Sequence, residues 1–164
     1  MPRGPLTMLP KAALGILHEV SRHLLKRPVT GIVAAAHTED GRWVLIRRSD
    51  TGTWALPGGT LEWGEMLRAG LKRELEEEAG IESFEFERLV GIYSRPDRDI
   101  RFHAVTVVAL CKVALPTLRP MNSLEIRDVG VFADADVPEP LAMGMSDMLR
   151  DARLAIDGAP AILE

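Results

Sequence analysis

Cysteine is nearly absent from this 164-residue sequence, which contains only Cys111. A single cysteine excludes an intrachain disulfide and is typical of a reducing compartment such as the cytoplasm. Long apolar runs are also absent, since none approaches the roughly 18 residues of a membrane-spanning helix. The run AALGIL at residues 12–17 is too short for the core of a signal peptide. We therefore expect a cytoplasmic protein that does not enter the membrane.

An excess of positive charge is lacking as well. The sequence has 20 Lys and Arg against 24 Asp and Glu, which gives a formal net charge of −4. This balance offers no electrostatic footprint for general nucleic-acid binding, so nucleic acid is not an expected partner. Hydrophobic residues make up 46% and charged residues 27%, as in an ordinary globular domain with its own core.

Hydrophobic spacing predicts an amphipathic helix near the N-terminus, at residues 11–26, which Pro28 ends. Its apolar positions are Leu14, Leu17, Val20 and Leu24. Residues 1–27 would form an N-terminal extension, and residues 28–164 one domain.

Strand patterns alternate with helical ones in the rest of the chain. A β-hairpin is predicted for residues 29–37 and 43–48, which are separated by the turn TEDGR. The segment WALPGG is a short extended piece, and a final helix is expected within residues 138–156. Three more strands are expected at residues 83–94, 101–114 and 128–133. This mixture predicts an α/β sandwich whose sheets are covered by helices.

Residues 65–79 are predicted to form one helix, which Gly80 closes at a position that favours a left-handed residue. At about 100° per residue, Glu74, Glu77 and Glu78 share one arc beside the apolar stripe, whereas Glu76 points to the opposite side. The three carboxylates therefore border the buried face of the helix.

This arrangement needs an explanation because like charges about 6 Å apart repel by roughly 2.8 kcal/mol at an effective dielectric near 20. Glu77 and Glu78 also lie near the helix C-terminus, where the macrodipole disfavours anions. Gly70 lies on the same side, one turn earlier, and is expected to leave room for a ligand. A hard divalent cation, Mg²⁺ or Mn²⁺, would compensate these charges. A solvated acidic face is the alternative, and it fits Glu76.

A longer pattern contains this helix. From Gly59, the segment GTLEWGEMLRAGLKRELEEEAGI matches G-x5-E-x7-R-E-U-x-E-E-x-G-U, where U is apolar, at every defined position. Those positions are Gly59, Glu65, Arg73, Glu74, Leu75, Glu77, Glu78, Gly80 and Ile81. The pattern is the Nudix box, and the chain resembles the Nudix hydrolase family more loosely over residues 29–155. The resemblance implies an α/β/α sandwich with a mixed sheet and hydrolysis of a nucleoside diphosphate linked to a group X.

The resemblance also implies roles for the box residues. Glu77 and Glu78 would bind the metal, and Glu74 would be a ligand or the catalytic base. Arg73 would orient a box glutamate by a bidentate contact. Glu65 would bind metal directly or through water.

Two further contributions would come from outside these side chains. The carbonyl of Gly58 or Gly59 would complete the metal site, because glycine lets the backbone approach closely. Many family members use a glutamate from a later loop as base or extra ligand, and Glu125 is the candidate here. The alternative for Glu125 is an ion pair with Arg127 or Arg119.

The segment YSRPDRDIRFHAV, residues 93–105, bears on the substrate. Pro96 lies 15 positions after Ile81 (96 − 81), where the resemblance points to enzymes of the ADP-ribose type. Tyr93 would stack on a base, and arginines would hold phosphate or ribose oxygens. These arginines are Arg95, Arg98 and Arg101. A solvated turn is the alternative.

Other residues allow two interpretations. Arg47 and Arg48 would reach substrate phosphates or be solvated on the surface. Trp43 and Trp54 are expected to pack in the core rather than stack on a base, and Trp63 is left open. Cys111, in an apolar strand-like run, is expected to be a buried and inert thiol.

The predicted function is Mg²⁺-dependent hydrolysis of ADP-ribose or a nucleoside diphosphate sugar. The alternatives are a nucleoside triphosphate or RNA 5′-end pyrophosphohydrolase, and a Nudix fold that only binds a ligand or partner. The intact set of box carboxylates disfavours the last. A homodimer is expected, because the apolar stripe of residues 11–26 has to be covered and relatives acting on ADP-ribose commonly pair. Packing of that stripe on its own domain is the alternative.

Overall fold

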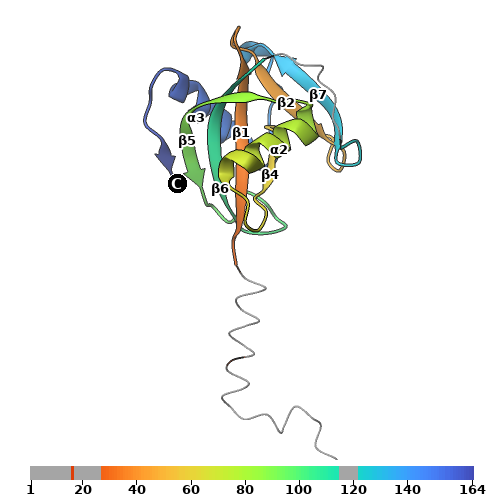
Figure 1. Cartoon of the computed structure of the whole chain (residues 1–164), viewed down its shortest axis with the longest axis vertical. Helices are drawn as coiled ribbons and strands as arrows, with labels where there is room; N and C mark the ends of the chain where they lie inside the picture. The colour runs from red at the N-terminus through yellow and green to blue at the C-terminus, as the bar shows by residue number, and fades with distance from the viewer. Residues whose placement is uncertain (1–15, 17–26, 115–121) are drawn as a thin grey trace, which may run out of the picture.

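The computed structural model describes residue 16 and residues 27–114 and 122–164. The helix expected at residues 11–26 lies outside these ranges except for Ile16, and the division of the chain near residue 27 stays a prediction. Within the described ranges, helices and strands are mixed along the chain, as the sequence predicted (Figure 1).

The centre of the sheet is a pair of long parallel strands, β1 (Val29–Thr38) and β6 (Ala104–Val113). They stay in register over ten residue pairs, from Val29 beside Ala104 to Thr38 beside Val113. A central strand with both faces covered is apolar throughout, and residues 32–36 of β1 are accordingly all buried.

The sheet divides beside β1. Its order is β3-β2-β1-β6-β5-β8, while β4 also pairs with β1 and β7 with β2. The outer strands are β2 (Trp43–Arg48), β3 (Trp54–Ala55), β4 (Gly58–Thr60), β5 (Phe84–Tyr93), β7 (Ile126–Phe132) and β8 (Ile162–Leu163). The end of β1 pairs with β2, but its beginning, at residues 31–33, pairs with β4. Strands β2 and β7 therefore diverge from β4 along β1. A pocket lies between these two parts of the sheet.

Two helices cover the sheet. Helix α2 (Leu67–Ala79) packs on β1, β2 and β4, and α3 (Met145–Ile156) packs on β5, β6 and β1. In Figure 1, α2 crosses in front of β1. Gly80 closes α2 with φ of 66°, which confirms its predicted left-handed conformation. Two short 3₁₀ helices, η2 (Asp134–Asp136) and η3 (Ala142–Gly144), precede α3.

The sequence predicted most strands correctly, including β2 to the residue and the hairpin turn between β1 and β2. Trp43 is buried and Trp54 packs edge-on against Phe132, so both belong to the packing, as expected. Cys111 is fully buried, and burial raises the pKa of its thiol to about 12, as expected for an inert residue. Strand β8, which runs parallel to the end of β5, was not predicted.

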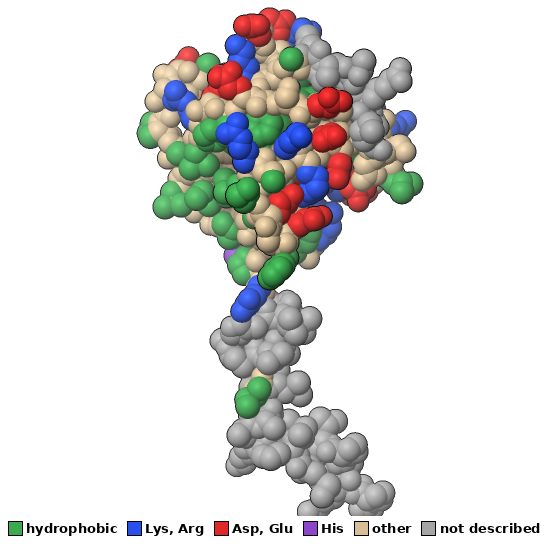
Figure 2. Space-filling view, viewed as in Figure 1, with side chains coloured by type: hydrophobic (Ala, Val, Ile, Leu, Met, Phe, Trp, Pro, Cys, Tyr) green, Lys and Arg blue, Asp and Glu red, His purple; other side chains and the backbone are tan. Residues whose placement is uncertain are grey.

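The visible surface carries charges of both signs. On the face drawn in Figure 2, basic side chains are scattered among acidic ones and form no continuous basic area. Among the described residues, no helix has the length and apolar character needed to cross a bilayer.

Candidate active site

Two buried carboxylates meet the backbone of strand β4 at Gly58 and Gly59. Glu74 and Glu78, one turn apart on α2, are each only 8% exposed. The Gly58 N–H donates a hydrogen bond of 2.7 Å to Oε2 of Glu78. A Cβ at Gly59 would collide with the carboxylate of Glu74, so only glycine allows this approach. The side chain of Glu77 is half exposed. The sequence had predicted that all three carboxylates border the buried face, so Glu77 differs from Glu74 and Glu78.

Arg73 joins the box carboxylates. Its Nη1 donates to Oε1 of Glu74 at 2.8 Å, and its Nε donates to Oε1 of Glu65 at 3.0 Å. Nη2 reaches the carbonyl of Thr60 at 3.2 Å, and Nη1 lies 3.5 Å from Oε2 of Glu77. One guanidinium therefore fixes carboxylates from both the helix and the preceding loop.

The charges of this cluster are incompletely compensated. Burial raises the pKa of Glu78 to about 8, and burial also raises the pKa of Glu74 although Arg73 opposes it. Glu65 behaves differently, because its hydrogen bonds with Arg73 lower its pKa. Ionised Glu74 and Glu78 therefore need a further positive charge beyond Arg73.

The donor set fits a hard divalent cation. Glu74, Glu77 and Glu78 supply carboxylate oxygens, and Gly58 and Gly59 line the same pocket. Within residues 27–114 and 122–164, no three acidic, histidine or cysteine side chains converge on one point as metal ligands do. Arg73 holds Glu74 and Glu77, while Glu78 accepts a hydrogen bond from the Gly58 amide. A bound cation would compete with these two contacts.

Gly70 does not have the expected role. A Cβ there would lie 2.5 Å from Cδ1 of Ile32 and 3.1 Å from Cδ1 of Leu61. The glycine therefore permits close packing of α2 on β1 and does not open space for a ligand.

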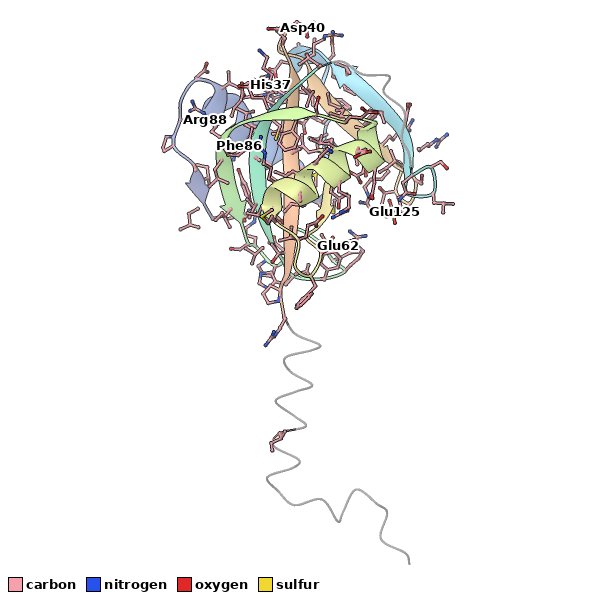
Figure 3. The ribbon with its side chains drawn as sticks, in the orientation of Figure 1. His37, Asp40, Glu62, Phe86, Arg88 and Glu125 are labelled. Carbon is pink, nitrogen blue, oxygen red and sulfur yellow. The ribbon has the colours of Figure 1, made fainter. Side chains whose placement is uncertain are left out.

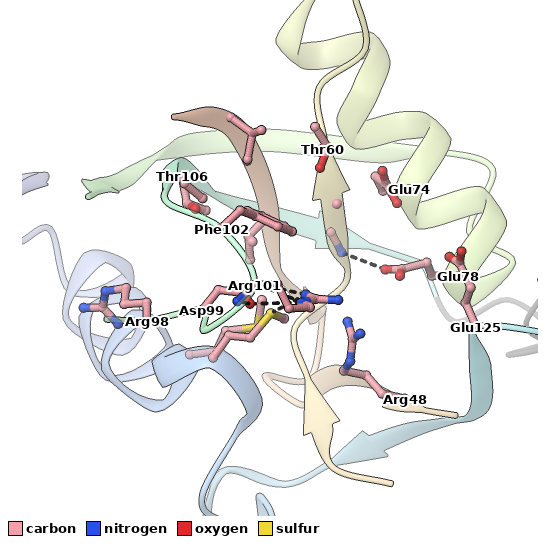
Figure 4. Close-up of a pocket in the computed structure, with 18 of the residues that line it drawn as sticks. Arg48, Thr60, Glu74, Glu78, Arg98, Asp99, Arg101, Phe102, Thr106 and Glu125 are labelled. Carbon is pink, nitrogen blue, oxygen red and sulfur yellow. Dashed lines mark hydrogen bonds and ion pairs between the residues drawn. The ribbon is translucent and has the colours of Figure 1, made fainter. Parts of the chain in front are cut away.

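The cluster forms one wall of a pocket with a volume of about 510 Å³ (Figure 4). Its acidic lining residues are Asp50, Glu74, Glu77, Glu78, Asp99 and Glu125. Its basic lining residues are Arg48, Arg73, Arg95, Arg98 and Arg101. Its larger apolar lining residues include Phe102, Leu124, Met143, Met145 and Met148. The pocket thus combines an acidic wall, several arginines and an apolar side.

Glu125 is placed beside the acidic wall by backbone contacts. The Asn122 N–H donates to the carbonyl of Glu77 at 3.0 Å, which holds this loop against the last turn of α2. The Ser49 N–H donates to the carbonyl of Glu125 at 2.7 Å. Figure 3 shows Glu125 near that end of α2, and Figure 4 shows it next to Glu78.

No cation within residues 27–114 and 122–164 pairs with the Glu125 side chain, so the alternative ion pair with Arg127 is not formed. Arg119 lies outside the described residues. The negative charge of Glu125 contributes to the raised pKa of Glu78.

Three predicted arginines line the pocket with side chains at least partly exposed. Arg48 pairs with Asp50 at 2.6 Å, and Arg101 pairs with Asp99 at 2.7 Å. Arg95 is half exposed, and its ionic contacts with other described residues are all loose, at 3.5 Å or more. Arg95 is thus the least constrained of the three, whereas Arg48 and Arg101 are each held by both oxygens of an aspartate.

Two predicted substrate residues are already engaged by protein partners. Tyr93 is buried, and its hydroxyl donates to Oδ2 of Asp151 at 2.9 Å, which corrects the expectation that its ring stacks on a base. Arg98 lines the pocket, but its side chain is only 8% exposed and is paired with Glu164.

Arg47 and Pro96 do not line the pocket. Nε of Arg47 donates to the carbonyl of Gly52 at 2.9 Å, and its guanidinium lies 6.0 Å from the ring centre of Trp54. Arg47 therefore supports the turn between β2 and β3, contrary to its expected contact with phosphate. Pro96 is exposed in a turn, as in the alternative interpretation of that segment.

Sequence reasoning missed several lining residues. Asp99 belongs to the segment 93–105, in which arginines but not Asp99 were predicted to bind substrate. Its position two residues before Arg101 could have indicated that these two side chains pair. Phe102, Met143 and Met145 offered no chemical signal, because apolar residues normally indicate core.

Comparisons with known proteins indicate one family. The family model described as NUDIX domain matches residues 26–152. A MutT-like protein from Streptomyces ambofaciens is 38% identical over 143 residues, which cover 87% of this chain and 80% of that protein. An ADP-ribose pyrophosphatase from Methanocaldococcus jannaschii is 38% identical over 78 residues, or 46% of each chain. The crystal structure of an ADP-ribose pyrophosphatase from Streptococcus suis superposes with a TM-score of 0.68 at 27% identity, covering 84% of this chain and 98% of that one.

Proposed function

The chain belongs to the Nudix hydrolase family, and we propose that it hydrolyses the pyrophosphate bond of ADP-ribose, or of a nucleoside diphosphate sugar, with Mg²⁺. Mn²⁺ is the second choice of metal. The observation that carries the proposal is the pocket itself, which buried Glu74 and Glu78 line together with Arg48, Arg95 and Arg101.

The metal would be held by the acidic wall. Glu74, Glu77 and Glu78 would bind it together with a carbonyl of Gly58 or Gly59. When bound, Mg²⁺ neutralises pyrophosphate charge and lowers the pKa of a coordinated water. Glu65 does not line the pocket, so its role is to fix Arg73.

The arginines supply the second half of substrate binding. Arg48, Arg95 and Arg101 would hold the phosphate oxygens, and the aspartates paired with Arg48 and Arg101 orient these side chains. Phosphoryl transfer depends mainly on such positioning and on charge stabilisation. The apolar side of the pocket, around Phe102, suits the flat face of a base.

Glu125 is the proposed general base, because no described cation neutralises it and it lies beside Glu78. It would take a proton from the attacking water while the water oxygen bonds to one phosphorus. The bond from that phosphorus to the bridging oxygen breaks, which releases AMP and ribose 5-phosphate from ADP-ribose. Glu74 is the alternative base, although its Oε1 already accepts a hydrogen bond of 2.8 Å from Arg73.

The substrate class is supported by the named relatives and by charge. Two of the similar proteins are called ADP-ribose pyrophosphatases. The pocket carries six acidic side chains against five arginines, so each additional phosphate of a nucleoside triphosphate would meet little spare positive charge. The net charge of −4 makes RNA a poor partner for the same reason.

A substrate panel tests this proposal. ADP-ribose, a nucleoside diphosphate sugar, a deoxynucleoside triphosphate and a 5′-triphosphorylated RNA are incubated with the full chain and MgCl₂. Phosphate released by added phosphatase is measured for the first two, and pyrophosphate or phosphate release for the others. The highest kcat/KM is expected for ADP-ribose or the sugar nucleotide. A preference for the triphosphates would overturn the substrate assignment.

A further inference from the structure

The pocket wall opposite the carboxylates belongs to residues 94–103, here called the arginine loop, and the side chain of Glu164 holds its beginning. Oε2 of Glu164 accepts hydrogen bonds from the N–H groups of Ser94 at 3.0 Å and Arg95 at 3.1 Å. The Glu164 N–H donates to the carbonyl of Ile92 at 3.0 Å, which extends the pairing of β8 with β5. The last described residue is thereby fixed to the entry of the loop by both backbone and side chain.

Arg98 extends this contact across the loop. Its Nε donates to Oε2 of Glu164 at 3.1 Å, and its Nη2 pairs with Oε1 of the same carboxylate. Its Nη1 donates to the carbonyl of Gly144 at 2.8 Å, at the start of α3, and its guanidinium lies over the ring of Tyr93 at 5.1 Å. The Arg98 side chain is only 8% exposed. Arg98 therefore ties the loop, β8 and the start of α3 together.

The segments joined in this way build the far side of the pocket. The arginine loop contributes Arg101 and Phe102, and the region beside Gly144 contributes Met143 and Met145. Neither Arg98 nor Glu164 contacts a box carboxylate. The two residues are therefore separated from the proposed metal site while they control the opposite wall.

We propose that Glu164 and Arg98 are positioning residues that set the affinity of the pocket for the base of the substrate. This inference rests on the proposed function. Loosening the loop would weaken the contact of Phe102 with the base, and this contact is made in the ground state and transition state alike. Such a loss raises KM and leaves kcat nearly unchanged. Arg98 holds the pKa of Glu164 at about 2, so the contact is present throughout the assay range.

Steady-state kinetics on ADP-ribose with Mg²⁺ test the inference in Glu164→Ala, Glu164→Gln and Arg98→Lys. Glu164→Ala is expected to raise KM about tenfold and to change kcat by less than about twofold, because only uniform binding is lost. Glu164→Gln, which keeps the shape and one acceptor, should show a smaller rise in KM. Asp157→Ala is the matched control, since Asp157 is an exposed acid near the end of α3 without a side-chain contact to another described residue; its KM should be that of the wild type.

Hydrogen exchange of the full chain provides a readout that does not depend on activity. Amides of residues 94–103 should exchange faster in Glu164→Ala than in the wild type, while those of α2 should not change. If Glu164→Ala is poorly folded by its melting curve, Glu164→Gln carries the test. The inference is overturned if the wild type is active and both Glu164 variants have the same KM as the wild type. It is also overturned if kcat falls as much as kcat/KM in these variants. An inactive wild type with faster loop exchange in the variants overturns the proposed function and supports the positioning contact.

Discussion

The carboxylate of Glu78 accepts a hydrogen bond of 2.7 Å from the backbone N–H of Gly58, and this is its one hydrogen bond among the described residues. The contact joins α2 to strand β4, whose Gly58 lines the pocket. Burial raises the pKa of Glu78 to about 8 because one neutral donor does not compensate a buried negative charge.

The metal-free protein should therefore lose stability as pH rises. The pKa of Glu78 is raised from 4.5 in the unfolded chain to about 8 in the folded one. The stabilisation by protonated Glu78 is therefore fully present below about pH 4.5 and is lost progressively as the pH rises to about 8. The slope is about 1.4 kcal/mol per pH unit for one proton. Melting temperatures in EDTA between pH 5 and 8 measure this effect. Glu78→Gln should flatten the curve, and parallel curves for both proteins would contradict the assignment.

Two adjacent glutamates should differ sharply in their effect on activity. Glu77 lines the pocket, whereas Glu76 is exposed outside it. Loss of a residue that only supports a metal ligand already lowers metal affinity or activity by about 10–100-fold. Glu77→Gln removes a proposed ligand itself and should therefore lower kcat/KM by about a hundredfold or more. Glu76→Gln serves as the control and should remain near the wild type. Equal activity of the two variants at saturating Mg²⁺ would exclude Glu77 as a ligand.

Glu125→Gln should lower kcat more than it raises KM, because a general base acts in the transition state. General acid–base catalysis contributes about 10²–10⁴-fold, so a fall of about a hundredfold in kcat is expected. Glu62→Gln, an exposed acid outside the pocket, is the control. An unchanged kcat for Glu125→Gln would leave Glu74 as the base.

The full chain is predicted to be a two-fold symmetric dimer through its N-terminal segment. The reason is the apolar stripe at residues 11–26, which a monomer would have to cover by itself. Light scattering on the full chain and on a chain starting at Arg27 measures the mass of each. A full chain of monomer mass at high micromolar concentration would refute the prediction. A dimer that persists after truncation would place the interface in the domain itself.

The sequence was most informative where local spacing determines structure. The hairpin of β1 and β2 follows from two apolar, strand-like runs on either side of a turn, and Gly80 ends α2 because its φ of 66° is costly for other residues. The placement of Glu74 and Glu78 together also follows, since residues four apart share one helix face.

Contacts between distant segments could not be predicted in this way. Arg98 and Glu164 are separated by 66 positions and meet only through the pairing of β8 with β5. Tyr93 was assigned to the substrate, but β5 contains two register shifts that obscure which of its residues face inward. Gly70 was predicted to leave room for a ligand, whereas the side chain of Ile32 occupies that room.

Hydrolysis of ADP-ribose by the wild type and Glu78→Gln, with Mg²⁺ or with EDTA, tests the central claim most directly. Chromatography of the products should show equal amounts of AMP and ribose 5-phosphate from the wild type with Mg²⁺, and almost none from Glu78→Gln or with EDTA. Equal rates of AMP formation by a folded Glu78→Gln variant and the wild type, or hydrolysis that continues in EDTA, would contradict a metal-dependent site at the Glu78–Gly58 contact.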